Sequence, residues 1–156
     1  MRMMLLAASL VLAIPTFTST AMAHDASVQV SGAWARATAP NAMSGGAFLT
    51  LTAHGHPDAL VGVSTPVAKT AELHETVNDK GIMKMLPAPV LALQPDAPVT
   101  LKPGGYHIML MELQHQLTRG ESFPLTLRFE HAPPQTVNVM IEGPGAAGPM
   151  AGMQHK

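Results

Sequence analysis

The sequence has 156 residues, 47% of them hydrophobic and 12% charged, which suits one domain with a sizeable buried core and argues against a disordered chain. Nine Lys and Arg against ten Asp and Glu give a formal charge of -1 without any basic run, so nucleic acids and anionic membranes are poor partners. Cysteine is absent, which excludes disulfides, a cysteine nucleophile, a lipidated cysteine, zinc–thiolate and iron–sulfur sites, and the thiolate of a blue-copper centre.

The first 23 residues have the features of a cleaved export signal. Arg2 gives a positive start, residues 3–14 are apolar, and Ala21-Met22-Ala23 matches the small-x-small cleavage pattern. The apolar stretch is shorter than the roughly 20 residues that a membrane-spanning helix needs. We therefore expect cleavage after Ala23 and a periplasmic protein that begins at His24.

The chain from there to residue 142 is a series of short β-prone runs separated by Gly, Pro, Asn and Asp. No helical pattern of convincing length is present. The predicted strands are residues 28–34, 46–53, 60–64, 71–77, 82–86, 90–93, 99–101, 106–113, 123–130 and 136–142. Pro95 and Pro98 restrict residues 91–99 to an edge or a connection. Ten short strands predict an all-β fold, an antiparallel sandwich or barrel.

The last residues differ in composition from the predicted domain. Residues 143–156 are rich in Gly, Pro and Ala and have little to bury, so we expect a flexible tail. The predicted organisation is therefore a signal peptide at 1–23, one domain at 24–142 and a Met- and His-containing tail at 143–156.

The strand period of two places His and Met residues together. In the run 106–111, His107, Met109 and Met111 share one face, and the three apolar residues between them form the other. Same-face neighbours on a strand lie roughly 6.5 Å apart, so His107 and Met109 can both lean toward one metal ion.

Two further runs supply similar side chains. Met83 and Met85 share a face of the predicted strand 82–86, and His74 points away from the apolar face of the strand 71–77. Together His74, Met85, His107 and Met109 would form a set of two imidazoles and two thioethers.

These ligand types favour copper. Thioether sulfur is soft and neutral and prefers Cu(I), and imidazole suits copper in either oxidation state. Methionine binds without losing a proton, which suits exchangeable binding. A methionine on a strand is nevertheless usually core filler, and a single histidine is usually a surface residue, so composition and spacing alone leave copper binding and packing as comparable interpretations.

Four of these residues have a distinctive spacing. His74 is followed after ten residues by Met85, and after a further twenty-one residues by His107-Ile108-Met109. In this motif the sequence resembles the periplasmic copper chaperones called PCuAC. Further similar segments are residues 33–36, 44–51, 71–74, 81–85 and 101–110, and the resemblance extends over residues 28–141.

The resemblance implies a cupredoxin-like β-sandwich that binds Cu(I) through His74, Met85, His107 and Met109. It also implies delivery of copper to the CuA centre of cytochrome c oxidase, in its subunit II, or to another periplasmic acceptor such as a second copper chaperone. Leu86 departs from the basic or polar residue expected in relatives, which leaves the choice of acceptor open.

Several residues outside the motif are secondary candidates. Met83 and Met111 could replace a copper ligand transiently, but packing is the role expected of them. Glu72 is expected either to orient the imidazole of His74 or to face water. A free amine and imidazole at His24 could chelate Cu(II). A second copper site in the tail would use Met150, Met153 and His155.

Other functions remain as alternatives. The protein could sequester copper for resistance, act as a copper enzyme with an N-terminal brace at His24, or serve as a β-sandwich interaction module with incidental methionines. Ser-His-Asp signatures, phosphate loops and recognisable pairs of catalytic carboxylates are absent, so no enzymatic activity is predicted.

Overall fold

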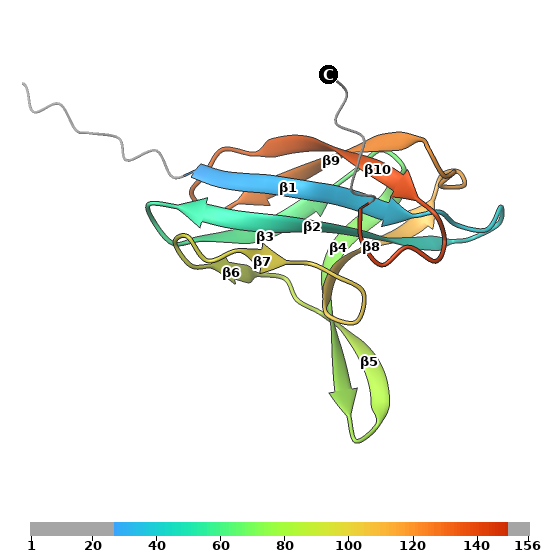
Figure 1. Ribbon diagram of the computed structural model, residues 1–156, viewed down its shortest axis with the longest axis horizontal. Coiled ribbons are helices and arrows are strands. Elements are labelled where there is room, and N and C mark those ends of the chain that lie inside the picture. The colour runs from blue at the N-terminus through green and yellow to red at the C-terminus, as the bar shows by residue number, and fades with distance from the viewer. Residues whose placement is uncertain (1–26, 150–156) are drawn as a thin grey trace, which may run out of the picture.

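The computed structural model describes residues 27–149. The regular secondary structure of these residues consists of β-strands (Figure 1). This range contains no helix long and apolar enough to cross a membrane. All ten predicted strands are present and differ from the prediction only at their ends. They are β1 (Ser27–Arg36), β2 (Ser44–His54), β3 (Asp58–Ser64), β4 (Ala68–Asp79), β5 (Ile82–Pro87), β6 (Leu91–Leu93), β7 (Val99–Thr100), β8 (Tyr106–Leu113), β9 (Ser122–Phe129) and β10 (Gln135–Glu142).

The strands form one mixed sheet in the order β5-β4-β8-β2-β1-β10-β9-β3-β6, with β7 paired to β2. The sheet does not close, and it folds over so that β3 and β4 come into contact. The predicted all-β sandwich is therefore confirmed. Neighbouring strands are antiparallel with one exception, the parallel pairing of β1 with β10. Residues 91–99 contain the short edge strand β6, as their prolines predicted.

The core lies between the two layers of the folded sheet and follows the strand period of two. In β9 the residues Phe123, Leu125, Leu127 and Phe129 are buried, while the residues between them are half-buried or exposed. On the β5-β4-β8 side, the core-facing residues include Leu73, Ile108 and Leu110, all buried. Each strand that buries one face consequently presents its alternate residues on the outer face.

The hairpin of β4 and β5 extends beyond the sandwich (Figure 1). The register of β4 with β8 ends at Glu75 opposite Tyr106, followed by one hydrogen bond from the Thr76 N–H to the Gly105 carbonyl oxygen at 3.1 Å. Residues 77–79 pair only with β5. Lys80 and Gly81 form the turn with positive φ angles of 53° and 88°, the conformation that tight hairpin turns need. The Asn78 side-chain oxygen accepts a hydrogen bond from the Gly81 N–H at 2.8 Å. All six residues of β5 are exposed.

A buried carboxylate joins β3 to the chain after β9. The oxygens of Asp58 accept hydrogen bonds from the backbone N–H groups of Ala59, His131 and Ala132 at 2.7, 3.0 and 2.8 Å. Burial of this carboxyl by itself raises its pKa, but the N–H groups of Ala132, Ala59 and His131 stabilise the charged form and hold its pKa below the ordinary value.

Substituting Asp58→Asn should lower the free energy of unfolding by about 1–3 kcal/mol, because the amide NH2 cannot accept and leaves a buried N–H unpaired. The lowered pKa means that the carboxylate stabilises the fold fully above the unfolded-state value of about 3.9, and that this contribution is lost as pH falls through the folded pKa. Urea unfolding should therefore show a wild-type advantage at pH 7 that narrows in acid.

The control is Asp79→Asn, which breaks only the exposed ion pair with Lys84. Equal losses of stability in the two variants would contradict the role assigned to Asp58.

Candidate metal centre

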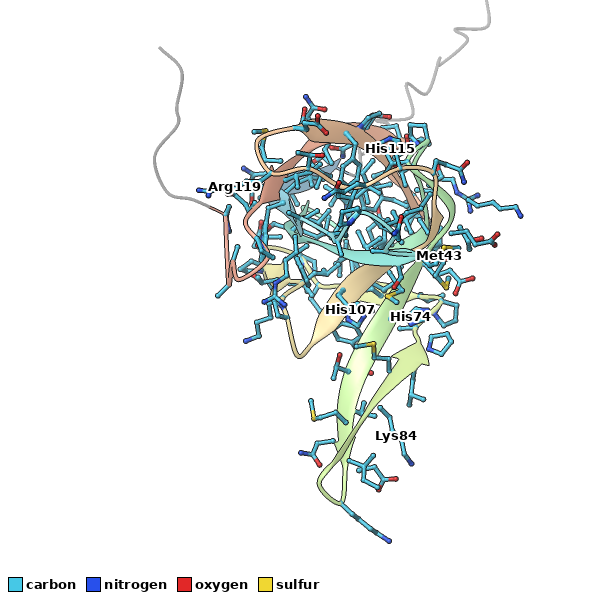
Figure 2. The ribbon with its side chains drawn as sticks, turned by 90° about the vertical axis from the view of Figure 1, so that its right-hand side faces the viewer. Met43, His74, Lys84, His107, His115 and Arg119 are labelled. Atoms are coloured by element: carbon cyan, nitrogen blue, oxygen red, sulfur yellow. The ribbon has the colours of Figure 1, made fainter. Side chains whose placement is uncertain are left out.

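Strand register brings the two predicted histidine ligands together. His74 of β4 lies directly opposite His107 of β8, and Glu72 lies opposite Met109. Opposed residues of an antiparallel pair point to the same face of the sheet. The rings of His74 and His107 have their centroids 6.0 Å apart at an interplanar angle of 59°. Figure 2 shows both side chains at the base of the hairpin.

The pairing of β5 with β4 brings the fourth predicted ligand to this face. Met85 of β5 lies opposite Thr76, two residues beyond His74 on β4. Residues two apart on a strand share a face, so Met85 faces the same side as His74. All four predicted ligands thus lie on the outer face of three adjacent strands, on the side away from the core residue Leu73.

His107 has one ring nitrogen bonded and one free. The residue is only 6% exposed, and its Nδ1 lies 3.0 Å from the carbonyl oxygen of Gly105. A carbonyl only accepts, so Nδ1 is the donor and the neutral ring carries its lone pair on Nε2. That Nε2 is buried and has no hydrogen-bond partner. Because buried polar atoms are nearly always paired, this nitrogen is suited to a metal ion.

His74 is held by a carboxylate. Its Nε2 lies 3.2 Å from Oε2 of Glu72, and its side chain is 13% exposed. The carboxylate accepts, so Nε2–H donates and the neutral ring leaves Nδ1 with the lone pair. A carboxylate that bonds the far nitrogen of a ligand histidine fixes its orientation and raises its basicity.

The two methionines differ in exposure. Met109 is partly buried on β8, whereas Met85 is 60% exposed on the projecting hairpin. The candidate site therefore has one enclosed side and one side open to solvent.

A cavity of 220 Å³ lies beside these residues and includes three of the four predicted ligands. It is lined by Arg36, Gly45, Gly46, Phe48, Thr76, Met85, Pro103, Gly104, His107 and Met109. Gly46 lies opposite Met109, and Phe48 stacks on Trp34 with ring centroids 4.6 Å apart. A Cβ atom at Gly46 would lie 3.3 Å from Phe48 Cζ, so glycine at this position lets the Phe48 ring lie close to the backbone of Gly46.

Arg36, Gly46 and Phe48 are cavity residues to which the sequence alone assigned no role. The period of two along β2 could have placed Gly46 and Phe48 on the face opposite its buried leucines. No local signal places Arg36, whose Nε donates to the carbonyl oxygen of Ala146 at 2.8 Å. This bond holds the first residues of the predicted tail next to the cavity.

The remaining predicted residues fall into two groups. His24, Met150, Met153 and His155 lie outside the described residues. Met83 is 58% exposed on β5, so the prediction that it packs is wrong. The reason is that β5 projects beyond the sandwich and has no layer against it.

Histidine and carboxylate groups alone do not make a metal site here. Within residues 27–149 no three or more His, Cys, Asp or Glu side chains gather where they could hold an ion. The other predicted donors on the face that carries His74 and His107 are the sulfur atoms of Met85 and Met109. Two imidazoles with two thioethers are a donor set that favours copper, and Cu(I) above all.

Solved structures with a similar fold include PCuAC domains. The apo PCuAC domain from PmoF1 has a TM-score of 0.66 and 27% identity over 78% of this chain and 98% of its own. The Cu(I) form of DR1885 from Deinococcus radiodurans has a TM-score of 0.59 and 30% identity over 80% and 85%. The copper-bound PCuAC domain from PmoF2, at 23% identity and a TM-score of 0.64 over 75% and 93%, shares the fold. The resemblance to PCuAC proteins is confirmed.

The chain belongs to the LpqE-like family, described as "Putative lipoprotein LpqE-like", which it matches over residues 28–141. It is 34% identical to "Putative lipoprotein Lxx21020" of Leifsonia xyli subsp. xyli, over 74% of this chain and 69% of that protein. It is also 31% identical to "Uncharacterized protein RP573" of Rickettsia prowazekii, over 75% and 67%.

Substituting Glu72→Ala should weaken Cu(I) binding by about 10- to 100-fold, because His74 loses the carboxylate that orients it. Nitrogen-15 NMR of the metal-free protein gives an independent measurement, since the Nε2–H form of His74 should dominate only while Glu72 is present. Glu112→Ala, which removes an exposed partner of Lys69, is the matched control. An unchanged His74 tautomer in Glu72→Ala would contradict this role.

Proposed function

We propose that this protein is a copper chaperone that binds one Cu(I) ion through His74, Met85, His107 and Met109. The observation that carries the proposal is the unpartnered, buried Nε2 of His107. It belongs to a residue that lines the same cavity as Met85 and Met109 and lies opposite His74. A buried nitrogen lone pair beside two thioethers has an evident use as a soft-metal ligand.

The chemistry of these side chains suits a carrier. All four donors are neutral, so the loaded site keeps only the charge of the ion, and binding releases no thiol proton. Met85 is exposed, which gives an incoming ligand access to the metal from the solvent side. A site that must give up its ion benefits from such an opening.

We infer that copper is delivered outside the cytoplasm, to the CuA centre in subunit II of cytochrome c oxidase or to another copper chaperone. Support for copper comes from the structural relatives, two of which are described as copper-bound or Cu(I) forms. Support for export comes from the family's description as lipoproteins. Since this sequence has no cysteine to lipidate, export would use the signal at residues 1–23, cleaved after Ala23, and leave a periplasmic protein.

Sequestration is the alternative within the same chemistry. A resistance protein would hold copper through the same four residues and would not pass it on. Sites for Cu(II) at His24 or at Met150, Met153 and His155, and an enzyme with a brace at His24, rest on sequence alone. Delivery is favoured because one ligand, Met85, sits on a hairpin that extends away from the domain.

Titration of the mature protein with Cu(I) against a chromophoric chelator should show one tightly bound ion. Loss of an orienting carboxylate is expected to weaken Cu(I) binding by about 10- to 100-fold. His107→Ala and Met109→Ala should each have a larger effect on the Cu(I) affinity, because each removes a direct ligand. Met140→Ala, an exposed methionine on β10, should leave the affinity unchanged.

Absence of Cu(I) competition by the wild type would refute the chaperone proposal. Tight binding without transfer to a purified apo CuA domain would instead favour sequestration.

A further inference from the structure

Met83 is an exposed methionine in line with the proposed copper ligands. It lies opposite Asn78 on the hairpin. This pair is two residues nearer the turn than the pair of Met85 and Thr76. The register therefore puts Met83 on the same face as His74 and Met85, farther from the sandwich. With 58% of its surface exposed and no layer packed on β5, core packing does not account for this residue.

The face of the hairpin that carries Met83 has no charged side chain beyond His74. Toward the turn it presents Thr76 and Asn78 from β4 and the two methionines from β5. The charged pair of Asp79 and Lys84, at 2.6 Å, lies on the opposite face of the same hairpin. A soft cation beside Met83 and Met85 consequently meets thioether sulfur without a competing carboxylate or a repelling ammonium group from the hairpin itself. The cationic side chain nearby is Arg36, which lines the cavity next to Thr76 and Met85.

Met83 and Met85 are close enough to share one ion. Same-face residues two apart on a strand lie roughly 6.5 Å apart, and methionine has three rotatable side-chain bonds with which to bring its sulfur inward. Both side chains are exposed, so these rotations are not blocked by packing. Cu(I) accepts such soft ligands.

We propose that Met83 is a transfer ligand, which forms with Met85 an outer Cu(I) position through which the ion leaves the chaperone. This inference rests on the proposed function. In the step, a Cu–S bond to Met83 forms while a Cu–N or Cu–S bond to an inner ligand breaks, and Met85 stays bound throughout. Copper remains Cu(I), and no proton or electron moves. The ion ends on the exposed hairpin, where an acceptor ligand can reach it.

The test is Met83→Leu, which keeps the apolar volume and removes the sulfur. The matched control is Met43→Leu, which changes a methionine that is 67% exposed and lies on the sandwich side of the site (Figure 2). Proteins loaded with one Cu(I) are mixed with excess bicinchoninate in a stopped-flow instrument. Methionine methyl NMR of the wild type follows the same residues on Cu(I) addition.

Met83→Leu should slow copper release by about tenfold, equivalent to about 1.4 kcal/mol in the barrier, because the outer position is lost. Its equilibrium Cu(I) affinity should change by less than about twofold, since the four inner ligands remain. The methyl resonance of Met83 should shift or broaden with Cu(I). Met43→Leu should match the wild type in rate and affinity, and the Met43 methyl should not respond.

The proposal requires both the slower release and the Met83 methyl response, and the absence of either would overturn it. A loss of affinity in Met83→Leu as large as in Met109→Ala would make Met83 a resident ligand and also overturn it. A wild type that binds no Cu(I) would be recognised before any variant is compared, and would remove the proposed function together with this inference.

Discussion

The register between β4 and β8 is the constraint on which the candidate site depends. On one face of this pair Leu73 lies opposite Ile108, and both are buried in the core. On the other face His74 lies opposite His107. A slip by one residue would move every side chain of the strand to the opposite face, exposing the leucine and burying a histidine without a partner. Burial of apolar surface therefore sets the positions of the two imidazoles.

The site combines a fixed half with an accessible half. His107 is buried and tied by its Nδ1 to the Gly105 carbonyl, and His74 is tied to Glu72. Met85 lies on a hairpin whose second strand is exposed along its whole length. Fixed imidazoles give the site a defined geometry, while a thioether on an exposed strand leaves room for ligand exchange. This division is suited to a protein that binds a metal ion and then releases it.

The neutral donors of the candidate site distinguish it from protein sites for hard cations such as Ca²⁺ and Mg²⁺ and from structural zinc sites. No group of three or more His, Cys, Asp or Glu gathers in the described part of the chain, so hard cations lack the charged oxygen ligands that they favour. The chain also lacks the cysteine thiolates of structural zinc sites. The chain belongs to the LpqE-like family and shares its fold with PCuAC domains.

The sequence by itself determined the ten strands, because alternation and turn residues are local signals, and it determined which four residues match the PCuAC motif. Only the tertiary structure decided what surrounds them. Residues far apart in the chain are joined by the parallel pairing of β1 with β10, by the bond from Arg36 to Ala146, and by the position of Gly46 and Phe48 beside Met109. The same holds for the exposure of Met83, which was predicted to pack. Periodicity assigns a side chain to a face of its strand, whereas burial depends on whether another layer covers that face, and that is fixed by non-local packing.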